Sequence, residues 1–235
     1  MTLSAINTYT GATEISGGTL ALTGTAAIAS PSIIVGASTT FDVSGLASTF
    51  ALGTGQTLSG PGTVAGAMNV SGTLSPGNSP GTLSTGDQAW LTGGDYNWQI
   101  LDAVGVAGEG YDTLAVTGTL DLGSLTAAGF NINLWSLASA GPDVNGNALN
   151  FIPANNYSWT LASATTAITG FDAANFFIRV GANNGTDGFS NGLDGGAFSV
   201  TQSGNNLLLN FTAVPEPGAA LLGGLGLLAL LRRRR

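Results

Sequence analysis

Apolar residues alternate with small polar residues in short runs over the first 85 residues of the chain. One phrase recurs between residues 8 and 85, in which a turn glycine precedes a β-forming threonine and an apolar residue; its copies include Gly18-Thr19-Leu20, Gly62-Thr63-Val64, Gly72-Thr73-Leu74 and Gly81-Thr82-Leu83. Alternation with a period of two predicts strands, and glycine supplies the positive φ angles that sharp corners need. No helical period is found before residue 214, so the pattern predicts an all-β fold.

Such short strands, separated by Gly, Ser, Asn and Pro turns, fit either a β-helix or a sandwich. We favour a parallel β-helix, or solenoid, because Thr and Ser suit a hydrated outer face and because each rung then buries its aliphatic face against its neighbours. A sandwich would need longer strands and hairpin turns of the Asn-Gly kind. The two such pairs, Asn145-Gly146 and Asn184-Gly185, lie in the later half.

Aromatic residues become frequent after residue 95, in runs that predict further strands, such as 96–101, 131–135, 157–161, 176–180 and 207–211. Bulky side chains are expected where a repetitive stack ends and must be covered. We therefore divide the chain into three parts: a solenoid over 1–95, a strand-rich C-terminal cap over 96–213, and a tail over 214–235. The first eight residues lack the basic and apolar regions of a signal peptide, so we expect the natural chain to begin further upstream; export by an unrecognised route is the alternative.

The charge distribution excludes one class of partner. Only 8% of residues are charged, and the five basic residues are Arg179 and the last four arginines. Without the tail, twelve acids face one arginine, for a net charge of about −11. A body this acidic repels phosphate backbones, so nucleic-acid binding is not expected.

The chain contains neither His nor Cys. Their absence removes the usual general base, the usual nucleophile–base pairs and the usual zinc ligands. Asp112 and Asp121 are candidates for a glycosidase pair by count alone, and we interpret both as turn or outer-face acids. Arg179 follows an apolar run and is interpreted as a strand-end arginine. We expect no enzyme activity and no cofactor.

One segment, Asp143-Val144-Asn145-Gly146-Asn147, has a superficial likeness to a calcium loop. A helix-flanked calcium loop needs Gly at its sixth position and an acid at its twelfth, where this chain has Ala148 and Ala154. An Asx-turn loop is the default expectation. Asp143, Asn145 and Asn147 are therefore only weak candidates for metal ligands.

The tail has the pattern of a short membrane anchor. Residues 218–231 are Gly, Ala and Leu without a charge, and as a helix they would extend about 21 Å, less than the roughly 30 Å of a hydrocarbon core. Four arginines follow and would hold the C-terminus on the cytoplasmic side: Arg232, Arg233, Arg234 and Arg235. A marginal span favours a transient inner-membrane anchor, and an ordinary membrane anchor is the alternative.

Two resemblances to known families follow from these motifs. Residues 7–20 resemble the autotransporter-associated β-strand repeat, and 66–83, with Ser75-Pro76-Gly77-Asn78-Ser79-Pro80-Gly81, resemble the phrase that closes such arrays. The segment that begins with residues 111–118 resembles the module that follows this closing phrase. The tail, with Pro215, Glu216 and Pro217 before the apolar stretch and the arginines, resembles the PEP-CTERM sorting signal. That resemblance implies recognition by an exosortase, cleavage near Pro-Glu-Pro, and export to an outer surface rich in exopolysaccharide.

The sequence thus favours a non-enzymatic, exported surface or extracellular-matrix protein that adheres to polysaccharide or to other cells. The alternative is a carbohydrate-active enzyme or a calcium-dependent carbohydrate-binding protein on a β-helix scaffold. Acids grouped with an exposed aromatic residue in one groove would favour that alternative. An autotransporter passenger is a third hypothesis, which we disfavour because a sorting tail occupies the C-terminus.

Overall fold

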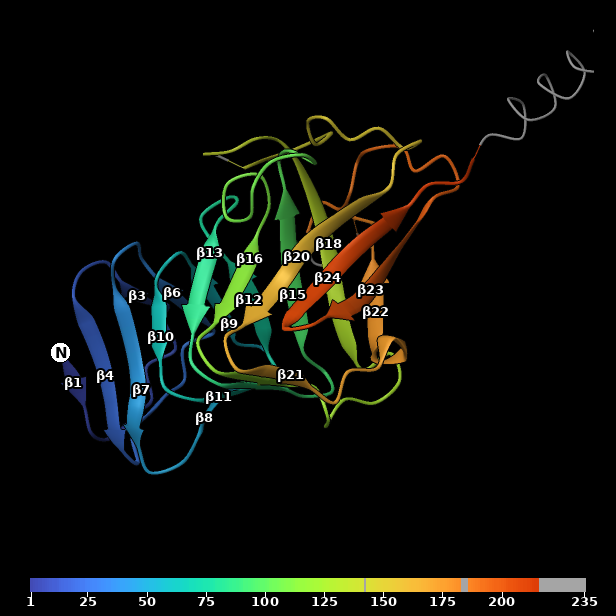
Figure 1. The fold of residues 1–235 in the computed structure, drawn as a ribbon. Helices are drawn as coiled ribbons and strands as arrows, with labels where there is room; N and C mark the ends of the chain where they lie inside the picture. The colour runs from blue at the N-terminus through green and yellow to red at the C-terminus, as the bar shows by residue number, and fades with distance from the viewer. Residues whose placement is uncertain (142, 183–185, 216–235) are drawn as a thin grey trace, which may run out of the picture.

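The computed structural model describes residues 1–141, 143–182 and 186–215, and its regular structure is almost entirely β-strand. Three main sheets form the body (Figure 1). Sheet 1 has nine strands, in the spatial order β1 (Thr2–Leu3), β4 (Thr19–Gly24), β7 (Thr40–Leu46), β10 (Thr63–Ala65), β13 (Thr82–Thr85), β16 (Thr113–Val116), β20 (Tyr157–Ala164), β24 (Asn206–Thr212) and β23 (Ala197–Ser203).

The other two sheets form the remaining sides. Sheet 2 contains β8 (Phe50–Leu52), β11 (Met68–Val70), β14 (Gln88–Trp90), β17 (Thr119–Asp121) and β21 (Ala167–Thr169). Sheet 3 contains β3 (Thr13–Ile15), β6 (Ser32–Val35), β9 (Thr57–Gly60), β12 (Thr73–Pro76), β15 (Asp95–Ile100), β18 (Phe130–Ser139), β19 (Val144–Asn145) and β22 (Phe176–Arg179). A small sheet pairs β2 (Ile6–Asn7) with β5 (Ala27–Ile28).

The order in which the chain visits these sheets defines a three-sided coil. β6, β7 and β8 belong to sheets 3, 1 and 2; the next three strands visit the same sheets in the same order, and so do the three after them. From β9 to β18, each strand pairs in parallel with the strand one turn earlier, as when β12 pairs with β9. This is a parallel β-solenoid with three strands per rung, which confirms the expected all-β, parallel fold.

Alternation places one side chain in the core and the next outside. Leu58, Leu74, Tyr96 and Ile132 occupy one inward column of sheet 3, where register pairs each with the next. All four are fully buried. Each inward side chain of one rung therefore packs against the inward side chain of the next, which is how a solenoid builds a core from short strands.

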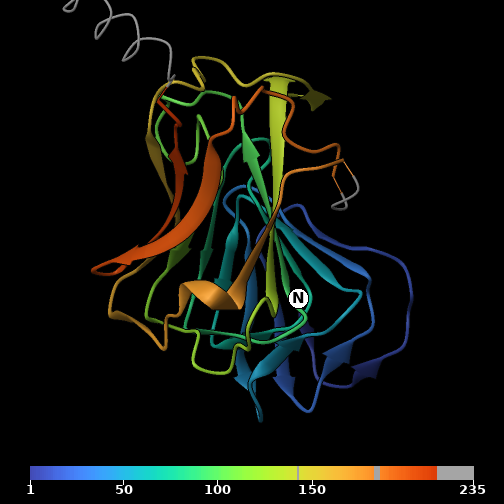
Figure 2. The ribbon, with the colours of Figure 1, turned by 90° about the vertical axis from the view of Figure 1, so that its right-hand side faces the viewer.

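Aromatic side chains take over the core in the later rungs. Trp90 stacks on Phe130 with ring centroids 4.4 Å apart, and Trp98 lies 5.6 Å from Trp159. The end of sheet 1 is closed by β24, which pairs antiparallel with β20, and by β23, which pairs antiparallel with β24 (Figure 2). A strand-rich, aromatic end to the stack was expected.

The parallel pairing runs across the expected boundary at residue 95. β15, which begins there, pairs with β12 on one side and β18 on the other, and parallel pairs continue to β20, β21 and β22. The division into units at 1–95 and 96–213 therefore stays a prediction, and no break in the stacking marks it. β19 pairs antiparallel with β18, and Asn145 lies within β19 rather than at a turn between the two strands.

The tail lies largely outside the described residues. Pro215 is exposed at the end of the described chain, whereas Glu216, Pro217, the expected helix over 218–231 and Arg232 to Arg235 lie beyond it. In the part of the chain that the structure describes, no helix has the length and apolar character needed to cross a membrane.

Candidate functional site on the outer face of sheet 3

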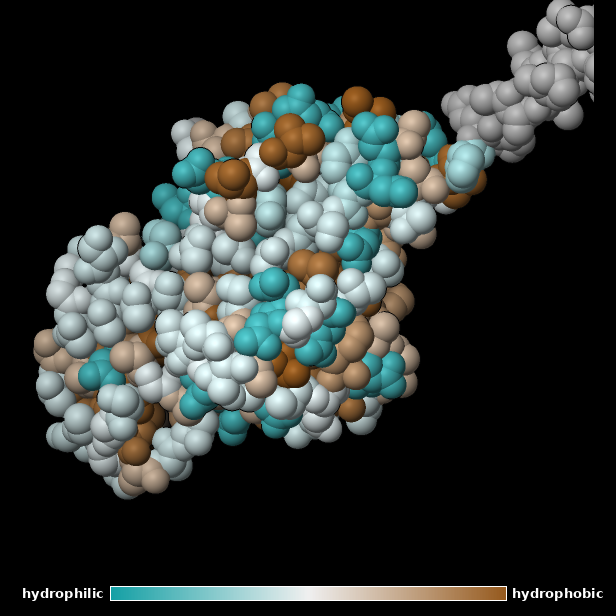
Figure 3. All heavy atoms as spheres, viewed as in Figure 1, coloured by the Kyte–Doolittle hydropathy of each residue, from teal (hydrophilic) through white to brown (hydrophobic). Residues whose placement is uncertain are grey.

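The outward positions of sheet 3 change character along the stack. One outward column, followed by register from β6 to β18, contains Ser32, Thr57, Thr73, Asp95 and Asn131. Small hydroxyls therefore give way to a carboxylate and an amide at the rungs that begin with β15. On the side of the molecule seen in Figure 3, where sheet 1 lies in front, the N-terminal half is mostly of intermediate hydropathy, and strongly polar and apolar residues are more frequent in the C-terminal half.

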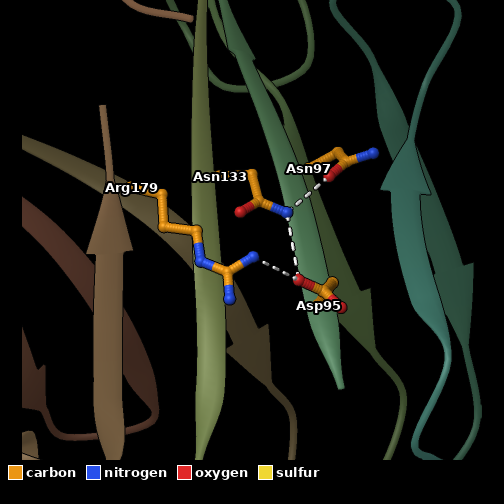
Figure 4. A network of polar contacts seen from close by, with 4 residues as sticks. All are labelled: Asp95, Asn97, Asn133 and Arg179. Carbon is orange, nitrogen blue, oxygen red and sulfur yellow. Dashed lines mark hydrogen bonds and ion pairs between the residues drawn. The ribbon is translucent and has the colours of Figure 1, made fainter. Parts of the chain in front are cut away.

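A polar network joins three neighbouring strands at these rungs (Figure 4). Asn133 of β18 donates through Nδ2 to Asp95 Oδ1 at 3.2 Å and to Asn97 Oδ1 at 2.9 Å, both on β15. Arg179, the last residue of β22, places Nη1 3.6 Å from the same oxygen of Asp95. The expected strand-end position of Arg179 is confirmed, and its side chain is 39% exposed.

Asn133 is the buried centre of this network. Only 2% of the residue is exposed, and its Oδ1 accepts no hydrogen bond in the described structure. Turning the amide over would direct its oxygen at two acceptor oxygens, so the bonds to Asp95 and Asn97 fix the orientation. Figure 4 shows Oδ1 on the side of the amide that faces Arg179. Two positions further along β18 and on the same face, Trp135 Nε1 is also buried without a partner.

An exposed aromatic ring borders the network. Phe177 lies on β22 two residues before Arg179 and is 52% exposed. The Arg179 guanidinium carbon lies 5.8 Å from the centre of the Phe177 ring, within the range of a cation–π contact. A flat apolar ring, a guanidinium, a carboxylate and the Asn97 amide are thus partly exposed on one face of the solenoid, around the buried amide of Asn133. These groups can form hydrogen bonds and stacking contacts with a ligand.

The two acids considered for catalysis are not brought together. Asp121 ends β17 in sheet 2, is exposed, and accepts from Gly123 N at 2.9 Å, which confirms it as a turn acid. The prediction that Asp112 lies at a turn or on the outer face is wrong. The residue is fully buried. Its two oxygens accept from Gly81 N at 2.7 Å and Gln99 N at 3.0 Å.

Burial raises the pKa of Asp112 well above its ordinary value. The backbone bonds from Gly81 and Gln99 favour the ionised form and oppose that rise, while the nearby Asp143 carboxylate adds to it. The burial of Asp112 could not be read from the sequence. Its two donors lie 31 and 13 residues away along the chain, so its burial is a property of the assembled rungs.

The weak metal candidates are already engaged within the protein. Asp143 accepts from Gln99 Nε2 at 2.8 Å, and Asn145 donates to Gly188 O at 3.0 Å and accepts from Ser190 Oγ at 2.8 Å. Asn147 is exposed. Across residues 1–141, 143–182 and 186–215, no group of three or more His, Cys, Asp or Glu side chains is arranged to hold a metal ion.

A hollow of about 720 Å³ lies at the N-terminal end of the solenoid. Leu3, Ile15 and Leu20 contribute apolar surface to it, and Glu14 is the one carboxylate side chain among the residues that line it. No second acid stands opposite Glu14 there. The hollow therefore does not contain the pair of carboxylates that glycoside hydrolysis requires.

Comparison with known proteins gives one finding for this same end of the molecule. Residues 1–22, which include β1, β2 and β3, match the family model described as Passenger-associated-transport-repeat. The match supports an autotransporter-associated repeat, as the sequence predicted, and suggests an exported, passenger-like surface protein. It covers a small part of the chain and does not extend to the tail. The comparison with curated proteins finds no match.

Proposed function

We propose that this chain is a non-enzymatic, exported surface or extracellular-matrix protein whose solenoid body is delivered by its C-terminal tail. The observation that carries the proposal is a passenger-type repeat at the start of a three-sided parallel solenoid. The order of the tail supports sorting: Pro215-Glu216-Pro217, an uncharged stretch over 218–231, and four arginines. An exosortase-type enzyme is the proposed partner of this tail.

The body suits display outside the cell. Neighbouring rungs are joined by continuous ladders of backbone hydrogen bonds, which leave few free strand edges along the stack. The outward positions of β9, β12 and β13 are Thr and Ser, which hydrate without charge. Among the described residues, Asp112 is buried whereas Asp121 is exposed, and the hollow at the N-terminal end has Glu14 as its one carboxylate side chain, which supports the proposal of a non-enzymatic role. The proposed localisation is the outer surface or extracellular matrix, after transient anchoring in the inner membrane.

Fusion of the tail to a secreted reporter tests the sorting step. Residues 214–235 are attached to the reporter and expressed in a host that contains an exosortase and in the same host without it. We expect surface delivery and a loss of mass only when the exosortase is present. Replacing Pro215, Glu216 and Pro217 together by alanine should abolish the mass loss. An Asn210→Ala change made in the full-length chain serves as a control outside the tail and should leave processing unchanged.

Two outcomes would reject the sorting proposal: processing that continues after the Pro-Glu-Pro motif is replaced, or delivery that does not depend on the exosortase. Replacing the four terminal arginines by glutamine separates orientation from recognition. Because arginines hold a flanking segment on the cytoplasmic side, this variant should translocate its C-terminus or fail to be retained at the inner membrane.

A second candidate function, carbohydrate binding on the same scaffold, is favoured by one observation. The exposed ring of Phe177 borders the network of Asp95, Asn133 and Arg179 on sheet 3. Hydrolysis is not favoured, because Asp95 has no second carboxylate within this network.

A further inference from the structure

We propose that the outer face of β15, β18 and β22 binds a neutral polysaccharide chain. This inference extends the proposed function by naming the class of ligand that the displayed body holds. The site is defined by Asp95, Asn97, Asn133, Phe177 and Arg179. These five outward positions differ from the serine and threonine residues that β9 and β12 place on the same face.

The groups of the site match the two surfaces of a sugar ring. A sugar has an apolar C–H face and a rim of hydroxyls that both donate and accept hydrogen bonds. Phe177 offers a ring that is 52% exposed, so its apolar surface can lie against the C–H face of a sugar. Asp95, 27% exposed at its side chain, accepts hydrogen bonds, and Arg179, 39% exposed, donates them to hydroxyls.

The unpaired oxygen of Asn133 is an independent sign of a ligand. Buried polar atoms are almost always paired, and each one without a partner costs about 1–3 kcal/mol. Asn133 Oδ1 is such an atom and lies beside the Arg179 side chain (Figure 4). A rotation of Arg179 toward a ligand hydroxyl would open this oxygen to a second hydroxyl. Trp135 Nε1, unpaired on the same face, offers a donor two residues further along β18.

Charge selects a neutral polymer over an acidic one. Arg179 is the only lysine or arginine in the described ranges, and Asp95 partly neutralises it at 3.6 Å. The rest of the body carries a net charge of about −11. A polyanionic polysaccharide would be repelled at low ionic strength, whereas a neutral chain would not.

Affinity electrophoresis of the purified full-length chain, kept in a non-ionic detergent, tests the proposal. Native gels contain dextran or hydroxyethylcellulose as neutral probes, or alginate as an acidic probe. We expect retardation by at least one neutral polymer. Phe177→Ala should weaken it by about tenfold, because a stacking contact and its buried area are lost. Arg179→Gln, which removes the charge and keeps donors, should weaken it by a smaller factor.

Tyr9→Ala is the matched control, because Tyr9 is an exposed aromatic residue, 41% exposed, at the opposite end of the solenoid. It should leave retardation unchanged. Thermal unfolding of Phe177→Ala should match that of the wild type, which separates binding from folding. Retardation by neither neutral polymer, retardation by alginate alone, or equal effects of Phe177→Ala and Tyr9→Ala would each overturn the proposal. None of these outcomes depends on tail processing, so this proposal and the sorting proposal fail separately.

Discussion

Replacing Asp112 with alanine tests whether one buried carboxylate joins two rungs of the solenoid. Oδ1 accepts from Gly81 N, just before β13, and Oδ2 accepts from Gln99 N, within β15. Asp112→Ala leaves both backbone N–H groups buried without an acceptor. Each such group costs about 1–3 kcal/mol, so the free energy of unfolding should fall by about 2–6 kcal/mol. That loss is a large share of the roughly 5–15 kcal/mol that stabilises an ordinary domain.

Urea unfolding, followed by tryptophan fluorescence and circular dichroism, measures this loss. Trp98 donates through Nε1 to Asp112 O, so the fluorescence reports from the altered joint. Asp87→Ala is the matched control: Asp87 Oδ1 also accepts a backbone N–H from the next rung, that of Thr119 at 2.6 Å, but Asp87 is exposed. Water can replace that acceptor, so the control should lose no more than about 1 kcal/mol. Equal losses in the two variants would refute the argument from burial.

The pH dependence of the same joint has a definite sign. Burial raises the pKa of Asp112, so the folded state holds its proton more tightly than the unfolded state does. The resulting stabilisation is fully present below the unfolded value of about 3.9 and is lost as the pH rises through the raised value. Two titratable groups act on Asp112: Tyr96, whose pKa burial also raises, and Asp143.

Asp112→Asn removes this titration. The stability of the wild type relative to the variant should therefore decrease as the pH is raised from about 4 toward neutrality. Unfolding curves measured for both proteins across that range provide the comparison, in which the titration of the other acids largely cancels. A difference that stays constant with pH, or that grows, contradicts the raised pKa.

Two further predictions concern the core and a corner of the solenoid. Trp90 is fully buried and stacks on Phe130. Trp90→Ala should therefore lower the free energy of unfolding by about 3–5 kcal/mol, measured by thermal or urea unfolding. A loss under about 1 kcal/mol would show that the ring does not support the core. Gly60 has φ +105°, and a Cβ there would collide with the backbone of Val35, whereas Gly55 has φ +85° and open space around it. Gly60→Ala should therefore be more destabilising than Gly55→Ala by at least about 1 kcal/mol, and similar melting temperatures would contradict this.

The alternating pattern of the sequence predicted the strands and their inward residues. In the copies Gly72-Thr73-Leu74 and Gly81-Thr82-Leu83, the threonine is partly exposed and the leucine is fully buried. The pattern did not reveal which side of the solenoid each strand forms. Gly62-Thr63-Val64 leads into sheet 1 and Gly72-Thr73-Leu74 into sheet 3, so the same phrase serves different sides. The side depends on where the chain turns, which these glycine-rich corners do not distinguish.

The candidate site was only half visible in the sequence. Polar residues alternate with apolar ones at the start of both strands, as Asp95 and Asn97 on β15 and as Asn131 and Asn133 on β18, and this alternation could be read from the chain. The contact between these residues could not be predicted from the sequence. The hydrogen bond from Asn133 to Asp95 joins residues 38 positions apart and depends on the register between β15 and β18. The burial of Asp112 was hidden for the same reason.

The stability of the solenoid does not by itself explain the outer face of β15 and β18. Inward side chains and strand pairing hold each rung, so outward positions can be small hydroxyls at little cost, as Thr57 and Thr73 are. A buried Asn133 with an unpaired oxygen costs about 1–3 kcal/mol that a threonine in its place would not. Local departures of this kind from the rules of stability are expected at functional sites. The contrast between the two parts of one face, with the same backbone geometry, is the strongest reason to look for a ligand at Asn133 and Phe177.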